Sequence, residues 1–171
     1  MTLPVHELDV LSANEATEIL RACCGSSRWT AAMIARRPFG TLDGLLRAAD
    51  QEWQHLSPSD WLEAFAHHPR IGEARAAARV GAAAQGWSAT EQARAVSADE
   101  RVKESLADAQ REYEARFGHI FLICATGKTA EEILAAARAR LGNDRETELR
   151  VAAEEQRQIT RLRLLKAVSA T

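Results

Sequence analysis

The sequence predicts an all-α protein that folds as a single compact multi-helix domain over residues 1–171. With 46% hydrophobic residues, a chain of this length can bury a core without disulfides or metal ions to hold it together. Residue patterns that start and end helices recur along nearly the whole chain. Only "IFLIC", residues 120–124, is typical of a strand, and one short strand cannot form a sheet.

The first two helices are expected before residue 54. Ser12 and Glu15 have the spacing of a capping box, and the helix that they open should run to "RACCG", where Gly25 can close it. The stretch "TLDGLLRAADQEW", residues 41–53, is expected to form the second helix.

The third helix is predicted over "SPSDWLEAFAHH", residues 57–68. Ser57 is suited to the N-cap, Pro58 to the first helical position, and Asp60 lies beside the unpaired backbone N–H groups of the first turn. Because Pro69 disfavours the α conformation in the residue before it, this helix should end at His68.

The second half of the chain is expected to hold three more helices. Two of them are opened by capping boxes, at Ser97 with Glu100 and at Thr129 with Glu132. The expected ranges are 97 to about 118, 129–142 with Gly142 as the closing residue, and about 144–168.

Charge and hydropathy limit the partners. The chain has 22 Lys+Arg against 24 Asp+Glu, a formal net charge of −2, whereas broad nucleic-acid binding needs a basic surface. No apolar run approaches the roughly 20 residues of a membrane span. The first residues, "MTLPVHELDVLS", lack the basic start and apolar core of a signal peptide. We therefore expect a cytosolic protein with neither nucleic acid nor membrane as a partner.

Cys23, Cys24 and Cys124 fit that compartment. Adjacent cysteines make a poor disulfide, and an odd number does not make a disulfide framework. The paired spacings of a zinc site are absent from the sequence. We interpret the cysteines as small buried hydrophobic residues and expect no metal site.

The stretch "ICATGKT", followed by a predicted helix, resembles the end of a phosphate-binding loop. The complete pattern requires a glycine five residues before Gly127, where this sequence has Leu122. Nucleotide binding is therefore not expected.

Two histidines precede Pro69. At the C-terminus of its helix, His68 lies where the helix dipole favours an imidazolium, and a histidine in such a bend suits general acid–base chemistry. His67 is the weaker candidate because it falls inside the predicted helix. The alternative is that His68 only caps the end of the helix.

A second candidate is "SATEQ". Ser88 and Glu91 have the spacing of a capping box, which by itself explains both residues without a function. Gln92 is not explained by the cap.

The last helix offers a test by periodicity. At about 100° per residue, Arg163 falls within the apolar arc, whereas Arg161 falls on the opposite side. The arc is defined by four apolar residues: Leu149, Ala152, Ile159 and Leu162. A buried arginine needs a partner or a ligand, so Arg163 could bind an anion or a carbonyl group. An interior salt bridge is the alternative.

Taken together, several stretches in this order resemble one family closely, from about Leu11 to Lys166. They are "CCGSSRW", "RRPF", "DWLEAFAHHPRIGE", "SATEQ", "YEARFGHIFLICATGKT" and "EEQRQITRLRL". The family is that of OHCU (2-oxo-4-hydroxy-4-carboxy-5-ureidoimidazoline) decarboxylases, which form (S)-allantoin in the last step of urate degradation. Each motif alone is weak, but the ordered set is specific.

The resemblance implies an all-helical homodimer that works as a carboxy-lyase without metal or organic cofactor. Matched by motif, its catalytic residues are His68 and Glu91. Residues expected to bind the small-molecule substrate are Pro69, Ser88, Gln92, Phe121, Ile123 and Arg163. The family pattern and the helical periodicity thus point separately to Arg163.

Three positions depart from the usual pattern: His67 beside the catalytic histidine, Arg94 after "EQA", and Gln110 where asparagine is common. Two alternatives stay open at this point. A relative could act on another ureidoimidazoline, or the family pattern could survive on a non-catalytic helical binding module. Such a module would be expected to have lost His68, Glu91 or Arg163, and all three are present.

Overall fold

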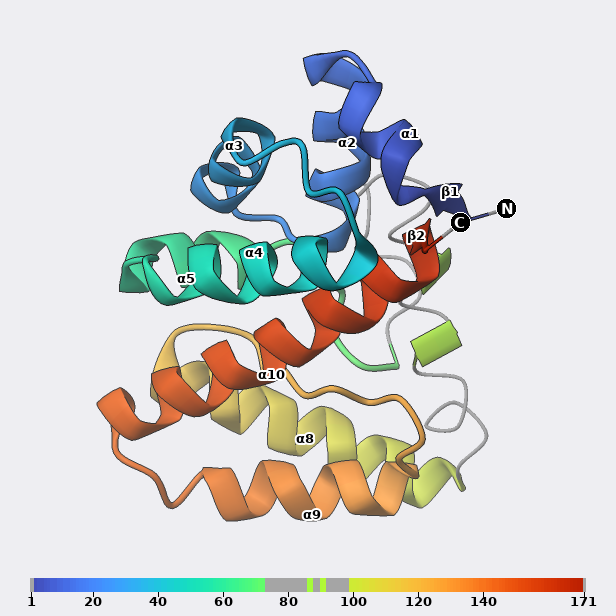
Figure 1. Ribbon diagram of the computed structural model, residues 1–171. Helices are drawn as coiled ribbons and strands as arrows, with labels where there is room; N and C mark the ends of the chain where they lie inside the picture. The colour runs from blue at the N-terminus through green and yellow to red at the C-terminus, as the bar shows by residue number, and fades with distance from the viewer. Residues whose placement is uncertain (1, 73–85, 88–89, 92–98, 171) are drawn as a thin grey trace. The chain divides into compact units, whose positions relative to one another are not determined.

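The computed structural model describes residues 2–72, 86–87, 90–91 and 99–170, and its elements are labelled in Figure 1. The prediction of an all-α fold is confirmed, because helices dominate and the described residues form only one very small sheet. The helices are α1 (Val5–Val10), α2 (Ala13–Cys23), α3 (Ser27–Ala35), α4 (Leu42–Gln54), α5 (Pro58–Phe65), α8 (Glu100–Phe117), α9 (Ala130–Arg140) and α10 (Arg145–Ala167).

The chain divides into two compact units. The first unit comprises residues 1–64 and 157–171, and the second unit comprises residues 65–156. Because α10 covers residues 145–167, its N-terminal part belongs to the second unit and its C-terminal part to the first. That the whole chain forms a single domain stays a prediction.

In the first unit, the N-terminal segment and the C-terminal segment are joined by a pair of short strands. The strands β1 (Leu3–Pro4) and β2 (Val168–Ser169) are parallel, with Leu3 opposite Val168. Figure 1 shows them side by side next to the two chain ends. This pair was not predicted, because two residues per strand are too few for a periodic pattern.

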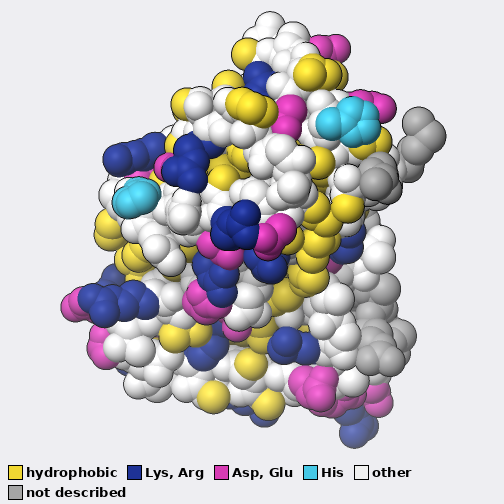
Figure 2. Space-filling view, in the orientation of Figure 1, with side chains coloured by type: hydrophobic (Ala, Val, Ile, Leu, Met, Phe, Trp, Pro, Cys, Tyr) yellow, Lys and Arg dark blue, Asp and Glu magenta, His cyan; other side chains and the backbone are white. Residues whose placement is uncertain are grey.

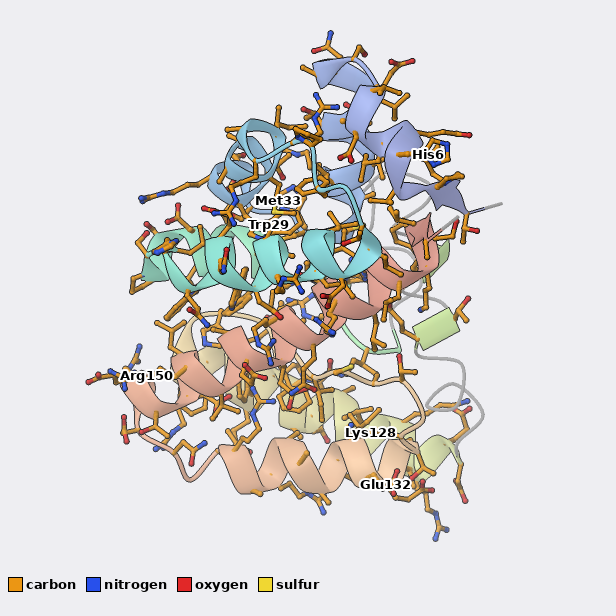
Figure 3. All side chains as sticks on the ribbon, in the orientation of Figure 1. His6, Trp29, Met33, Lys128, Glu132 and Arg150 are labelled. Atoms are coloured by element: carbon orange, nitrogen blue, oxygen red, sulfur yellow. The ribbon has the colours of Figure 1, made fainter. Side chains whose placement is uncertain are left out.

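The core of the first unit includes the contact between α3 and α4. Trp29 and Met33, labelled in Figure 3, lie one turn apart on α3, and both are fully buried. The indole Nε1–H of Trp29 donates to the carbonyl oxygen of Ala49 on α4 at 3.1 Å, so the buried polar atom is satisfied. Helix α3 was not predicted: Ser26 caps it, but Trp29 stands where a capping box has glutamate.

Most predicted helix starts are confirmed. Capping boxes are present at Ser12 and Thr129, and the Thr41 side chain caps α4. At the start of α5, the backbone N–H of Ser57 donates to the Asp60 carboxylate at 2.8 Å. Helix α8 is capped two residues later than predicted: Asp99 caps it, and Ser97 lies outside the described residues.

The predicted helix ends are partly wrong. Gly118 adopts the left-handed conformation that closes α8, with φ of 82°. Gly25 does not close α2 in the left-handed conformation: Cys24 is already extended, the φ of Gly25 is not positive, and Ser26 follows as the cap of α3. Gly142 follows the end of α9 but its φ is not positive, since Leu141 continues in the αR region.

The second unit is built on α8 and α9, which lie side by side in Figure 1. Its hydrophobic core joins these helices to the stretch that follows α8, where Phe121, Ile123 and Ala125 are buried. Residues 120–125 carry no strand or helix, so "IFLIC" forms a connection that is buried from Phe121 onward rather than part of a sheet.

No helix among the described residues is long and apolar enough to cross a membrane. On the face seen in Figure 2, Lys and Arg side chains lie beside Asp and Glu side chains, so charges of both signs are mixed there.

Candidate active site

His68 follows the end of α5, three residues later than the last helical residue. The helix ends at Phe65, and Ala66 and His67 form a turn, so the predictions that the helix reaches His68 and contains His67 are wrong. In a continuing helix, residue 69 would donate its N–H to the carbonyl oxygen of Phe65, but Pro69 has no N–H. The backbone N–H of His68 donates to that carbonyl instead, at 3.0 Å, which tightens the last turn and releases the chain early.

The residues after His68 are attached to α8. We call residues 66–72 the His68 loop. The guanidinium of Arg70 donates to both carboxylate oxygens of Glu114, at 2.6 and 2.7 Å. The backbone N–H of Ile71 donates to Oε1 of Gln110, and Nε2 of Gln110 donates back to the carbonyl oxygen of Ile71, each at 3.0 Å. The loop is thereby fixed to α8 at two successive residues.

Of the three predicted residues in "SATEQ", the structure describes Glu91 alone. Glu91 is helical and half-buried, whereas Ser88 and Gln92, like Arg94, lie outside the described residues. Burial raises the pKa of the Cys124 thiol, and the charges of Glu155 and, more weakly, Glu91 raise it further. Glu91 is thus near enough to Cys124 for its charge to act on that thiol.

Three side chains hold the backbone of that stretch. Nη1 of Arg140 donates to the carbonyl oxygen of Leu122 at 2.8 Å. The backbone N–H of Cys124 donates to Glu155 at 2.7 Å, and Nζ of Lys128, labelled in Figure 3, donates to the carbonyl oxygen of Cys124 at 3.0 Å. Because both backbone groups of Cys124 are paired with charged side chains, the stretch is rigidly positioned.

Phe121 and Ile123 point into the core of the second unit. They are 2% and 6% exposed and belong to its hydrophobic cluster. The Arg140 guanidinium lies 4.7 Å from the centroid of the Phe121 ring, a cation–π contact. Their location shows a packing role, and their contact with substrate stays a prediction.

A buried polar cluster beside this stretch was not anticipated from the sequence. Glu148 is fully buried and accepts hydrogen bonds from Arg140, from the Tyr113 hydroxyl and from Asn143. Burial and the hydrogen bond to Glu148 hold the pKa of Tyr113 far above its ordinary value, so its hydroxyl stays protonated. Its members come from three helices and a turn, and no local spacing in the sequence brings them together.

Arg163 lies in the first unit and is buried, 3% exposed, which confirms the inference from periodicity. Arg161 is exposed and pairs with Asp50 at 3.3 Å. Burial raises the pKa of the Cys24 thiol to about 11, while a hydrogen bond with Thr160 and the charge of Arg163 oppose that rise. Arg163 is thus close to Cys24 in the interior of the unit.

The described site residues predicted from the sequence fall in both compact units, and their assembly into one site stays a prediction. His68, Pro69, Glu91, Phe121 and Ile123 all belong to the second unit, and Arg163 belongs to the first. Cys23, Cys24 and Cys124 are buried and form no disulfide, as expected. Among the residues that the structure describes, no group of three or more His, Cys, Asp or Glu side chains is placed to hold a metal ion.

The fold and these side chains define an all-helical protein that carries residue types suited to acid–base chemistry. Its residues 9–165 match the model of the OHCU decarboxylase family, and the chain belongs to that family.

Relatives and solved structures agree with this assignment. The chain is 35% identical over 150 residues to "Uric acid degradation bifunctional protein TTL" of Arabidopsis thaliana, covering 87% of this chain and 46% of that protein. It is 28% identical to "Uric acid degradation bifunctional protein PucL" of Bacillus subtilis (strain 168), covering 96% of this chain and 33% of that protein. The chain therefore spans less than half the length of these curated relatives.

Two crystal structures have the same fold. One is a crystal structure of OHCU decarboxylase in the presence of (S)-allantoin, with a TM-score of 0.75, 34% identity, and coverage of 87% of this chain and 96% of that chain. The other, of (S)-allantoin synthase, has a TM-score of 0.73 at 19% identity over 98% of this chain and 54% of that one, and shows the fold alone.

Proposed function

We propose that this protein is a carboxy-lyase that decarboxylates OHCU to (S)-allantoin, the last step of urate degradation. The observation that carries the proposal is the likeness, over 87% of this chain and 96% of that chain, to an OHCU decarboxylase solved in the presence of (S)-allantoin. The presence of His68, Glu91 and Arg163 at the motif positions supports it. The proposed enzyme is a cytosolic homodimer that works without metal or organic cofactor.

The substrate supplies its own electron sink. One ring carbon bears the carboxylate and a hydroxyl group, and the adjacent imine carbon bears the ureido group. When the bond to the carboxylate breaks, its electron pair moves toward the imine, and carbon dioxide leaves. The former imine nitrogen takes up a proton from solvent, the hydroxyl proton is lost as that carbon becomes a carbonyl, and the former imine carbon takes up a proton. Protonation from one face sets the S configuration.

The side chains divide these tasks. His68 and Glu91 accept and pass on the hydroxyl proton, since an imidazole and a carboxylate can each act as a general base. Gln92 and Arg163 orient the carbonyl and ureido groups, because an amide and a guanidinium donate directed hydrogen bonds. Pro69, Ser88, Phe121 and Ile123 complete the substrate-binding surface.

The test is a coupled assay that follows allantoin by circular dichroism. Urate oxidase and hydroxyisourate hydrolase generate the unstable substrate in place, and the native protein, His68→Ala or His6→Ala is added. We expect rapid growth of the (S)-allantoin signal with the native protein and with His6→Ala, which changes an exposed histidine. We expect His68→Ala to lack it. A racemic, unaccelerated product with the native protein would refute the proposed function.

A further inference from the structure

The His68 loop depends on α8 for its conformation. After α5 ends at Phe65, the backbone N–H of His68 donates to the carbonyl oxygen of Phe65 at 3.0 Å and ties the loop to the end of that helix. Pro69 has no N–H and adds no backbone donor. The following residues, Arg70 and Ile71, are both tied to α8 by side chains. His68 thus lies between a backbone hydrogen bond to Phe65 and the two contacts that attach Arg70 and Ile71 to α8.

The two ties come from adjacent turns of α8. Gln110 and Glu114 are four residues apart, so their side chains project from the same face of the helix. Both lie in its C-terminal half, and Gly118 ends the helix just after Glu114 by accepting the left-handed conformation. The helix end carries a partial negative charge, which favours the approach of the Arg70 guanidinium.

The ties differ in chemistry. Gln110 is 3% exposed, and its amide pairs with both backbone groups of Ile71 in the way a neighbouring strand would. Removing this amide leaves a buried N–H and a buried C=O without partners. The Arg70–Glu114 pair is bidentate but partly exposed, at 42% and 23% for the two side chains. Gln110 therefore holds the backbone of the loop at Ile71, and Glu114 holds the side chain of Arg70.

We propose that Gln110 and Glu114 are positioning residues that hold His68 in its catalytic orientation through the Arg70–Ile71 segment. This inference rests on the proposed function of His68. Neither residue needs to touch the substrate, because the backbone of the loop transmits their effect over two or three residues. Gly72, with φ of 87°, adopts the left-handed conformation directly after the tethered residues.

The kinetic expectation is a loss in kcat with little change in KM. A misplacement of about 1 Å in a catalytic group costs up to about 100-fold in rate. We expect Gln110→Ala to lower kcat by about 10- to 100-fold and Glu114→Gln by about 3- to 10-fold, while KM changes less than about 3-fold. The charge-exchanged variant Arg70→Glu/Glu114→Arg should recover most of the activity that either single exchange loses.

A matched control lies on the same helix. Asp108 pairs with Arg111, and both side chains are about 70% exposed, far more than the Arg70–Glu114 pair. Asp108→Asn removes one carboxylate from α8, as Glu114→Gln does, without touching the His68 loop. We expect its kcat to equal that of the native protein.

A readout independent of activity separates positioning from folding. The imidazole signals of His68 in a long-range ¹H–¹⁵N spectrum are assigned by their absence from His68→Ala, and are followed against pH in each variant. We expect the shifts and midpoint to change in Gln110→Ala and Glu114→Gln but not in Asp108→Asn. The partly exposed Glu114 provides a variant that folds even where Gln110→Ala does not.

The outcomes are distinct. Unchanged His68 signals in Glu114→Gln and in folded Gln110→Ala overturn the proposal, whether or not the rates fall, because a loss of activity would then reflect the folded fraction alone. Unchanged kcat in an active enzyme overturns it as well. If the native protein lacks the decarboxylase activity but the His68 signals move as expected, the proposed function fails while the positioning by α8 stands.

Discussion

Glu148 is expected to be the most sensitive single position for stability in the second unit. Its side chain is fully buried and is the common acceptor for Arg140, Tyr113 and Asn143. Nε and Nη2 of Arg140 donate to the same carboxylate oxygen, at 2.8 and 2.5 Å. The substitution Glu148→Gln keeps the shape of the side chain and removes its charge, which leaves the buried Arg140 guanidinium uncompensated.

The magnitude follows from burial. Breaking a buried ion pair by neutralising one partner costs about 3–5 kcal/mol. That cost is a large part of the roughly 5–15 kcal/mol that stabilises a domain. With a urea dependence of about 2 kcal/mol per molar, the unfolding midpoint should move down by about 1.5–2.5 M.

The assay is urea unfolding followed by circular dichroism, with two further variants. Glu146→Gln, in the exposed pair with Arg150, lies on the same helix and should cost less than about 1 kcal/mol. The double variant Arg140→Met/Glu148→Leu should recover much of the loss, because apolar residues of similar volume can replace a buried ion pair. A Glu148→Gln midpoint within experimental error of the Glu146→Gln midpoint would refute the reasoning.

Three other predictions concern single residues. Burial lowers the pKa of His119 below its ordinary 6.5, so the unfolded chain binds the proton first, and the free energy of unfolding should fall as pH drops through 6.5 toward the folded pKa. His119→Phe should weaken that slope in urea titrations from about pH 7.5 to about pH 5, and an unaltered slope would contradict the assignment. Arg163→Met should lower kcat/KM of the proposed reaction by about 100-fold or more, whereas Arg161→Met should stay within about 3-fold; equal losses would count against the helical-face argument. With a pKa of about 11, the Cys24 thiol should be alkylated by iodoacetamide far more slowly in the native than in the urea-unfolded protein, as peptide mass spectrometry would measure. Equal rates would show that this thiol is accessible.

Features encoded by neighbouring residues could be predicted from the sequence. The capping boxes at Ser12 and Thr129 involve residues three apart, and the burial of Arg163 follows from the periodicity of one helix. Helix α3 was missed because its cap, Ser26, lacks the glutamate that completes the signal.

Features that depend on tertiary contacts could not be predicted in this way. Gln110 meets Ile71 across 39 residues of sequence, and Tyr113 meets Glu148 across 35. The early end of α5 belongs to the same class in part, because the missing N–H of Pro69 acts on a carbonyl four residues earlier. His68 itself could be chosen from the sequence, but the side chains that hold its loop could not.

The pairing of Leu3 with Val168 has a consequence for folding during synthesis on the ribosome. The first unit combines residues 1–64 with residues 157–171, so its early helices emerge well before their remaining partners are made. At about 5–20 residues per second, translation of the intervening residues 65–156 takes roughly 5–18 s. During that interval the second unit can fold, while the first unit stays incomplete and part of its apolar surface remains exposed to solvent. Arg163 belongs to residues 157–171, the segment whose synthesis allows the first unit to be completed. The buried guanidinium therefore takes its place only when the first unit finishes folding.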